Sequence, residues 1–324
     1  MLNTSMLKSD IASDLDCAAK LLQEGKLVAV PTETVYGLAA DATNAEAVRK
    51  IFIAKGRPAD HPLIVHLPDA TAMSNWAADI PEAAYKLAAA FWPGPLTLLL
   101  PKAEHVDACV TGGLDSIGLR VSAHPVLLKL LTSAKLAVAA PSANPYKRLS
   151  ATSAQQVLET MAGKIDAVLD GGQCEFGLES TIVSLISDKV QVLRAGPISA
   201  EEIAEVLGCE VETPKQHQVK VSGNVAAHYQ PKTKLCCATT AELPALLANS
   251  TQKVAVLALN PLAKAPFWQY QMPQDARAYG RELYKQLYQA DLCGAELIVV
   301  ETPPTDNTWL AVQNRLMRAA FQEV

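Results

Sequence analysis

Lys55-Gly56-Arg57-Pro58 runs into His61-Pro62-Leu63-Ile64-Val65-His66, and this stretch decides how the first half of the chain is interpreted. Its apolar segment, Leu63 to Leu67, is typical of a buried strand. A second polar cluster, Pro141-Ser142-Ala143-Asn144, follows the apolar run Leu136 to Ala140. Ligands of α/β proteins bind beside the ends of such strands. Two cations, a hydroxyl and an amide suit a triphosphate and a small polar co-substrate better than they suit a core.

Outward from these clusters, apolar periodicity and capping residues predict alternating helices and strands. Helices are expected at residues 13–22, 45–55, 81–91, 125–132, 153–161 and 199–207. Strands are expected at 27–30, 63–67, 96–100, 117–121, 136–139 and 167–169, with 181–185 and 190–194 paired as a hairpin. Because βα units are mixed with a hairpin, the fold class is α/β, with a twisted mixed sheet and flanking helices.

A linker and a second domain follow this pattern. Residues 212–233 are polar and are interrupted by Pro214, Gly223 and Pro231, which is typical of a linker. Beyond it, strands at 234–238, 254–259 and 297–301 alternate with helices at 241–248, 276–293 and 308–321. The predicted domains are therefore residues 1–211, and a smaller Rossmann-like α/β domain at 234–324. The latter has no Gly-x-Gly-x-x-Gly after its first strand, so no dinucleotide is expected there.

Composition limits the possible partners. The 324 residues are 50% hydrophobic and 19% charged, with a net charge of −5, so any RNA contact needs a local basic patch. No secretory signal or membrane span is visible, and a cytoplasmic location is the expectation. The seven cysteines include no Cys-x-x-Cys pair, which predicts reduced thiols and no structural metal.

Several familiar catalytic motifs are missing from the sequence. It contains no phosphate-binding Gly-x-x-x-x-Gly-Lys-Ser/Thr loop, no His-Glu-x-x-His helix and no Gly-x-Ser-x-Gly elbow. We therefore expect a reaction without a covalent nucleophile or structural metal, run by positioning and charge neutralisation.

The two polar clusters and several other segments together resemble the YrdC-like superfamily, whose best-known members are threonylcarbamoyl-AMP synthases. The resemblance rests on Lys-x-Arg followed by Ser-x-Asn, and on further segments in the same order. These are Pro31 to Leu38, Phe91 to Thr97, Gly118 to Val121, Gly177 to Val183 and Leu193 to Gly196. In addition, His228-Tyr229-Gln230-Pro231 resembles the linker motif of the two-domain form.

The resemblance implies a reaction. L-threonine and bicarbonate give a carbamate, which attacks the α-phosphate of ATP, so that pyrophosphate leaves and L-threonylcarbamoyladenylate remains. Mg²⁺ is expected to accompany ATP as part of the substrate. Proteins acting downstream would transfer the group to tRNA as N6-threonylcarbamoyladenosine, and direct contact of this chain with tRNA would be weak.

The resemblance also implies site residues. Lys55 and Arg57 are the expected catalytic residues, facing the triphosphate. The expected ATP-binding set is Lys55, Arg57, His61, Ser116, Ser142, Asn144, Arg148, Ser150, Arg194 and Tyr229. The expected threonine-binding set is Thr32, Thr34, His66, Arg120 and Ser180. His61 and the loop 145–150 depart from the family pattern.

Three of these residues also have an interpretation from the sequence alone. Arg120 lies in the apolar segment Ile117 to Val121, and a buried arginine must meet a carboxylate of the protein or of a ligand. Lys55 follows a helix end, where lysine is commonplace. From the sequence alone, Tyr229 is a plain anchor that packs the linker on a domain, whereas the resemblance implies a lid over the nucleotide site.

Two other functions are compatible with the motifs. One is another carbamoyl-adenylate-forming enzyme, such as the domain found in hydrogenase-maturation carbamoyltransferases, although the zinc-finger and acylphosphatase segments that accompany that domain are missing. The other is a non-catalytic RNA-binding module of the same fold, against which the net charge of −5 argues.

Overall fold

The chain forms two compact units. The computed structural model describes residues 2–214, 219–223, 225 and 227–320. The first unit contains the chain up to Tyr146, Ala151–Glu175, and the part from Glu179 to the linker. The second unit contains the chain from Val225 onward, together with two short segments, Lys147–Ser150 and Phe176–Leu178.

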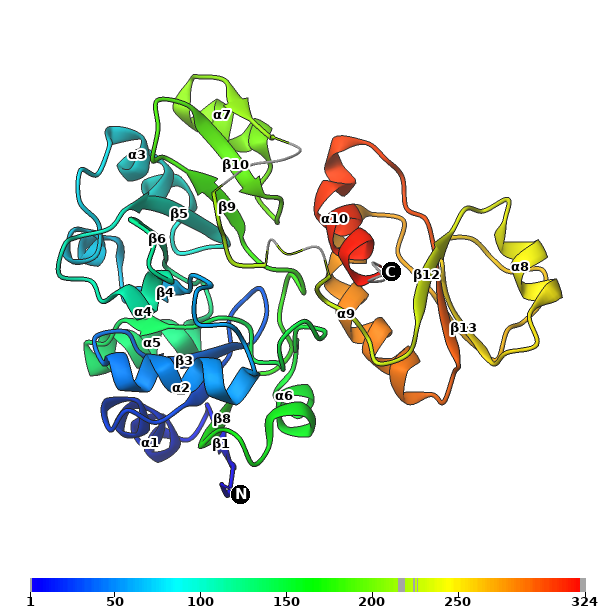
Figure 1. Cartoon of the computed structure of the whole chain (residues 1–324), viewed down its shortest axis with the longest axis horizontal. Coiled ribbons are helices and arrows are strands. Elements are labelled where there is room, and N and C mark those ends of the chain that lie inside the picture. The colour runs from blue at the N-terminus through cyan, green and yellow to red at the C-terminus, as the bar shows by residue number, and fades with distance from the viewer. Residues whose placement is uncertain (1, 215–218, 224, 226, 321–324) are drawn as a thin grey trace. The chain divides into compact units, whose positions relative to one another are not determined.

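A mixed sheet forms the centre of the first unit (Figure 1). In the described part of the chain it has eleven strands, in the order β1-β8-β2-β3-β7-β4-β6-β5-β9-β10-β11. In chain order these are β1 Ser5–Lys8, β2 Val28–Val30, β3 Gly37–Asp41, β4 Ile64–His66, β5 Leu96–Pro101, β6 Ser116–Arg120, β7 Val138–Ala139, β8 Ala167–Asp170, β9 Thr181–Ser184, β10 Val190–Arg194 and β11 Val211–Glu212. Parallel pairs such as β4 with β6 occur beside antiparallel pairs such as β5 with β6, which confirms the predicted mixed sheet.

Helices cover both faces of this sheet. They are α1 Ala12–Gln23, α2 Ala45–Lys55, α3 Glu82–Phe91, α4 Ala108–Thr111, α5 Pro125–Ala134, α6 Ala154–Met161 and α7 Ala200–Leu207, with a 3-10 turn at Ala70–Asn75. Helices α2, α3, α6 and α7 pack in the main core on one face, and α1 and α5 pack on the opposite face. The six helices expected from the sequence agree with α1, α2, α3, α5, α6 and α7 to within a few residues, whereas the one-turn helix α4 and the 3-10 turn were not predicted.

The strands missed by the sequence analysis are short or poor in β-forming residues. Strand β3 is Gly-Leu-Ala-Ala-Asp, whose glycine, alanines and aspartate are all depleted in strands. Strand β1 has only four residues and pairs with β8 at the end of the sheet. Long-range pairing, rather than local propensity, makes both segments extended.

In the central strands, alternate side chains point to opposite faces of the sheet, with the main core on one face and the expected site residues on the other. Val65, Leu98 and Leu119 point from β4, β5 and β6 into the main core. Side chains alternate between faces along a strand, so the adjacent His66, Thr97 and Arg120 point to the opposite face. The expected threonine site therefore lies on the face opposite the main core.

The second unit is a small parallel α/β domain, as predicted. Its described strands are β12 Leu235–Ala238, β13 Val254–Ala258, β14 Trp268–Gln271 and β15 Leu297–Glu301, in the order β12-β15-β13-β14. All three strand pairs are parallel. Helix α8 Leu243–Asn249 lies on one side of the sheet, and α9 Ala276–Leu292 and α10 Leu310–Ala319 lie on the other (Figure 1). A 3-10 turn, Asn307–Trp309, precedes α10.

Glu301, the last residue of β15, fastens the loops at one end of this second sheet. Its buried carboxylate accepts hydrogen bonds from Thr240 Oγ1 at 2.7 Å and from the Leu259 amide at 2.6 Å. It also accepts from the Asn260 amide and side chain, at 3.0 and 2.8 Å. In parallel α/β sheets ligands bind at this carboxyl end, and here a carboxylate of the chain itself ties the loops together.

The described residues contain neither a membrane-spanning helix nor a cluster of metal ligands. None of the helices there is both long and apolar enough to cross a bilayer. The seven cysteines are free thiols. The same residues contain no group of three or more His, Cys, Asp or Glu side chains arranged to hold a metal ion.

Candidate active site

Lys55 connects the two polar clusters. It is the last residue of α2, and the helix ends because Gly56 adopts a left-handed conformation with φ of 64°. The buried Lys55 Nζ donates hydrogen bonds to the backbone oxygens of Ser142 and Asn144, both at 2.5 Å. The Lys-x-Arg and Ser-x-Asn motifs, far apart in sequence, therefore meet in one place.

The surroundings of Lys55 disfavour its positive charge. Burial lowers its pKa well below the ordinary value, the Arg57 charge lowers it further, and Glu179 acts in the opposite direction. Like charges disfavour each other's charged forms, and a carboxylate favours the charged form of a lysine. An anion bound beside Lys55 would act against both effects and favour the charged form of the lysine.

The loop after α2 carries Arg57 and His61. Arg57 is buried, and its Nη2 donates to the Pro62 backbone oxygen at 2.9 Å. The His61 ring meets the Tyr146 ring edge-on, with centroids 5.6 Å apart. Burial, then the Arg57 charge, lowers the pKa of His61, so this ring is neutral at pH 7 and can donate one hydrogen bond.

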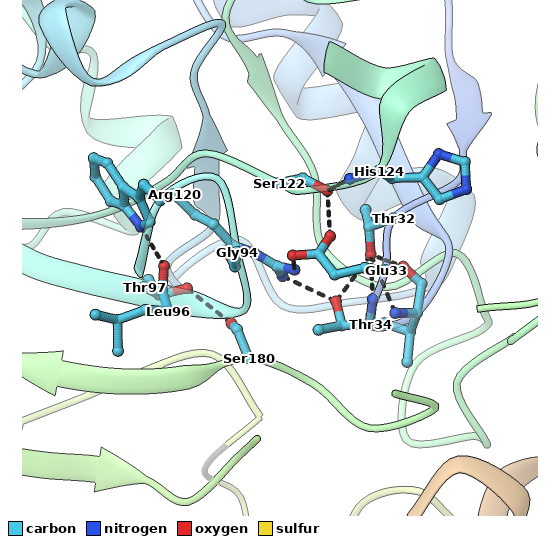
Figure 2. Close-up of polar contacts among 12 residues, drawn as sticks. Thr32, Glu33, Thr34, Gly94, Leu96, Thr97, Arg120, Ser122, His124 and Ser180 are labelled. Carbon is cyan, nitrogen blue, oxygen red and sulfur yellow. Dashed lines mark hydrogen bonds and ion pairs between the residues drawn. The ribbon is translucent and has the colours of Figure 1, made fainter. Parts of the chain in front are cut away.

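Arg120 contacts two residues of the turn after β2, and also Gly94, which precedes β5 (Figure 2). Its Nη1 donates to Thr34 Oγ1 at 2.9 Å and its Nε donates to the Gly94 oxygen at 3.2 Å. Its Nη2 forms a buried ion pair with Glu33 Oε1 at 2.6 Å. Of the two partners open to a buried arginine, the structure provides the protein carboxylate. Two of the five N–H donors of Arg120 are left after these three contacts.

His66 lies beside Arg120, because the two residues are paired in register between β4 and β6. Burial, followed by the Arg120 charge, lowers the pKa of His66 to about 3, so its ring is neutral at pH 7. Its Nδ1 atom is buried and has no hydrogen-bond partner among the described residues. A buried polar atom of this kind can accept a ligand.

Ser180 joins the expected threonine site to the expected nucleotide site. Its hydroxyl forms a 2.8 Å hydrogen bond with Thr97 Oγ1 and accepts a 2.9 Å hydrogen bond from Arg194 Nη2 (Figure 2 shows the first). Arg194 also donates from Nη1 to the Ser222 backbone oxygen at 2.9 Å.

Ser116 lies on the same face of β6 as Arg120, four residues away, which is roughly 13 Å along a strand. That spacing leaves room for two neighbouring subsites on one surface.

The remaining expected residues belong to the second unit. Arg148 Nη1 donates to the Pro231 oxygen at 3.1 Å, and Ser150 is buried. The Tyr229 ring is buried, stacks on Tyr284 with centroids 5.5 Å apart, and lies under the Arg315 guanidinium. These contacts describe an anchor within the second unit, and the lid remains a prediction.

Three residues of this network were not predicted as site residues from the sequence: Glu33, Thr97 and Ser122. Glu33 lies inside the Pro31 to Leu38 segment and is the carboxylate that Arg120 requires. Thr97 is the polar residue among the leucines of β5. No sequence motif marks Ser122, because its role depends on its closeness in space to Glu33, to which it donates a hydrogen bond.

The fold and this site assign the chain to the class of YrdC-like α/β proteins. The Escherichia coli protein YciO, 19% identical, shows the same fold with a TM-score of 0.56 and covers 63% of this chain and 100% of its own. The family model described as "Telomere recombination" matches residues 20–196, and the model "Threonylcarbamoyl-AMP synthase, C-terminal domain" matches residues 198–321. The chain belongs to the two-domain threonylcarbamoyl-AMP synthase family.

Individual relatives are similar over both units. Threonylcarbamoyl-AMP synthase of Pyrococcus abyssi is 39% identical, over 94% of this chain and 93% of its own. The Bacillus subtilis protein of the same name is 38% identical, over 94% and 92%. The crystal structure of P. abyssi Sua5 complexed with L-threonine matches with a TM-score of 0.90 at 37% identity, covering 98% of this chain and 97% of that one.

Proposed function

We propose that this protein synthesises L-threonylcarbamoyladenylate from L-threonine, bicarbonate and ATP, with release of pyrophosphate. The observation that carries the proposal is the meeting of Lys55 with the Ser142 and Asn144 loop, within a chain whose relatives carry this activity in their name. Relatives of that name match across both units, which favours this reaction over the two alternatives considered from the sequence.

In this reaction the cations neutralise charge. Lys55, Arg57 and Arg194 would face the phosphates, where they stabilise the charge that develops as pyrophosphate leaves. Ser180 touches Arg194 and lies on the threonine side, so it would hold the carbamate against the α-phosphate. The amino acid would bind beside Thr34, His66 and Arg120.

Mg²⁺, bicarbonate and tRNA enter as parts of the proposal. Mg²⁺ would arrive bound to the ATP phosphates and bridge them. Bicarbonate would react with the threonine amine. The product would pass, in the cytoplasm, to proteins that modify tRNA, with at most weak contact between this chain and tRNA.

The test measures pyrophosphate release and the AMP-containing product from ATP, with threonine and bicarbonate each omitted in turn. We expect product only when both are present. Pyrophosphate release that ignores threonine would point to another carbamoyl adenylate, and tight RNA binding without product would point to an RNA-binding module.

A further inference from the structure

The turn that carries Glu33 is closed by its own side chains. Thr32 Oγ1 accepts from the amides of Thr34 and Val35, at 3.1 and 3.2 Å, and donates to the Val35 oxygen at 2.6 Å. The side chains of Glu33 and Thr34 are thereby fixed, and both reach Arg120 (Figure 2).

Both carboxylate oxygens of Glu33 have protein partners. Oε1 pairs with Arg120 Nη2, and Oε2 accepts from the Ser122 hydroxyl. The Ser122 oxygen in turn accepts from the His124 amide at 3.3 Å. Arg120 ends β6, and Ser122 follows two residues later. The Glu33 carboxylate therefore contacts two residues at the end of this strand. Glu33 therefore affects a ligand through Arg120.

The direction of the hydrogen bond between Arg120 and Thr34 is fixed by chemistry. Arginine can only donate, so Thr34 Oγ1 accepts from Arg120. A carbonyl can only accept, so the Thr32 proton is used on the Val35 oxygen. The Thr34 hydroxyl, 2.8 Å from Thr32 Oγ1, keeps its own proton and one lone pair besides the one that Arg120 uses. An N–H group of an amino acid can satisfy that lone pair.

We propose that Glu33 is a positioning residue of the amino-acid subsite. Its carboxylate holds the Arg120 guanidinium in the orientation that fixes Thr34 as an acceptor and leaves two guanidinium donors for the ligand. The inference rests on the proposed function, because it takes L-threonine as the ligand of this subsite.

A double-mutant cycle tests the proposal. Glu33→Gln keeps the size of the side chain but removes the charge, and we expect it to raise the Kd and KM for threonine about 10- to 100-fold while the KM for ATP changes less than about 2-fold. Because Glu33 acts through Arg120, adding Glu33→Gln to Arg120→Lys should weaken threonine binding no more than about 3-fold further. Additive effects, or an unchanged threonine Kd in a folded Glu33→Gln protein, would overturn the proposal.

Two further variants control for loss of stability. Ser122→Ala removes one hydrogen bond to Glu33 and keeps the charge, so we expect a folded protein whose threonine Kd rises by a factor of about 3 to 10. Glu301→Gln removes an equally buried carboxylate from the second unit, and it should lower thermal stability without changing the threonine Kd. A threonine Kd raised equally by Glu301→Gln, or unchanged by Ser122→Ala, would contradict the assignment.

The controls also separate this inference from the proposed function. If the wild-type protein forms the AMP-containing product and Glu33→Gln binds threonine equally well, only the positioning role is wrong. If the wild-type protein neither binds threonine nor forms product, the proposed function itself is wrong.

Discussion

At the scale of single residues, the site depends on charges that are buried and held in place. Arg57 is the clearest case on the nucleotide side, since its loop position and buried guanidinium suit a phosphate contact. We expect Arg57→Ala to lose about 2–4 kcal/mol of transition-state stabilisation, or about 30- to 1000-fold in rate, measured as pyrophosphate release.

Arg49 provides the matched control for Arg57. It lies on the same helix, α2, where its exposed guanidinium pairs with Glu46. Arg49→Ala should retain near-normal activity, because an exposed pair contributes little. A folded Arg57→Ala protein with the turnover of Arg49→Ala would count decisively against the site.

The buried His66 predicts a dependence of stability on pH. Its pKa is about 3 in the folded protein against 6.5 ordinarily, so between these values the unfolded chain binds a proton that the folded one does not. Stability must therefore fall as pH decreases through this window, by up to about 1.4 kcal/mol per pH unit from His66 alone.

Denaturant unfolding of His66→Asn and wild type between about pH 4.5 and 6 measures this contribution. Glu33 hardly interferes in that range. Burial raises its pKa, but Arg120 and the hydrogen bonds outweigh burial, so the net pKa lies below 4.5 and its contribution is lost only under more acidic conditions. The variant should show the flatter profile, and parallel profiles would mean that His66 is protonated in the folded state.

At the scale of elements, strand β6 carries both subsites and has its only glycine between them. A Cβ at Gly118 would lie 3.3 Å from Thr97 Cγ2 and 3.4 Å from Ile64 Cγ1, which is tighter than most van der Waals contacts of a Cβ atom. We expect Gly118→Val to destabilise the protein by about 1–3 kcal/mol through overpacking.

The same variant should affect function more than stability. The two valine methyl groups would occupy the surface between Ser116 and Arg120, so substrate turnover should fall even at temperatures where the protein is fully folded. Thermal unfolding and steady-state kinetics of Gly118→Ala and Gly118→Val separate the two effects. Normal kinetics in Gly118→Val would show that this part of the sheet lies outside the site.

At the scale of the whole molecule, the two units are interleaved in sequence. The first unit has its own core, yet Lys147–Ser150 and Phe176–Leu178 belong to the second unit. Within that unit, a Cβ at Gly177 would come within 2.5 Å of the Arg281 backbone oxygen, so these segments pack closely there.

Truncation after Pro214 removes the second unit from Val225 onward, together with Ser222, which accepts a hydrogen bond from Arg194 of the first unit. The cut keeps β11, which pairs with β10, so we expect a first unit that unfolds cooperatively. Synthesis of the adenylate should be reduced, because Arg148, an expected ATP-binding residue, loses its hydrogen bond to the Pro231 oxygen. Full activity after truncation would show that the second unit is dispensable.

Tyr229→Ala in the full chain completes that comparison. If the lid prediction holds, the variant should lose product to hydrolysis faster than wild type, measured as the decay of the AMP-containing product. If truncation lowers activity and Tyr229→Ala leaves it unchanged, Tyr229 is only the anchor seen against Tyr284 and Arg315.

The sequence by itself determined the class of fold, the succession of most helices and strands, and the requirement that Arg120 meet a carboxylate. These follow from local periodicity, capping and the cost of an unpaired buried charge, all of which are present in short stretches of chain. Strand β3 was not predicted from the sequence, because its alanines have no local preference for a strand. Pairing with β2 and β7 decides its conformation. Only the tertiary structure decided that the carboxylate is Glu33 and that Lys55 binds the Ser142 loop. These contacts join residues some 90 positions apart, 33 with 120 and 55 with 142, whose distance no local pattern encodes.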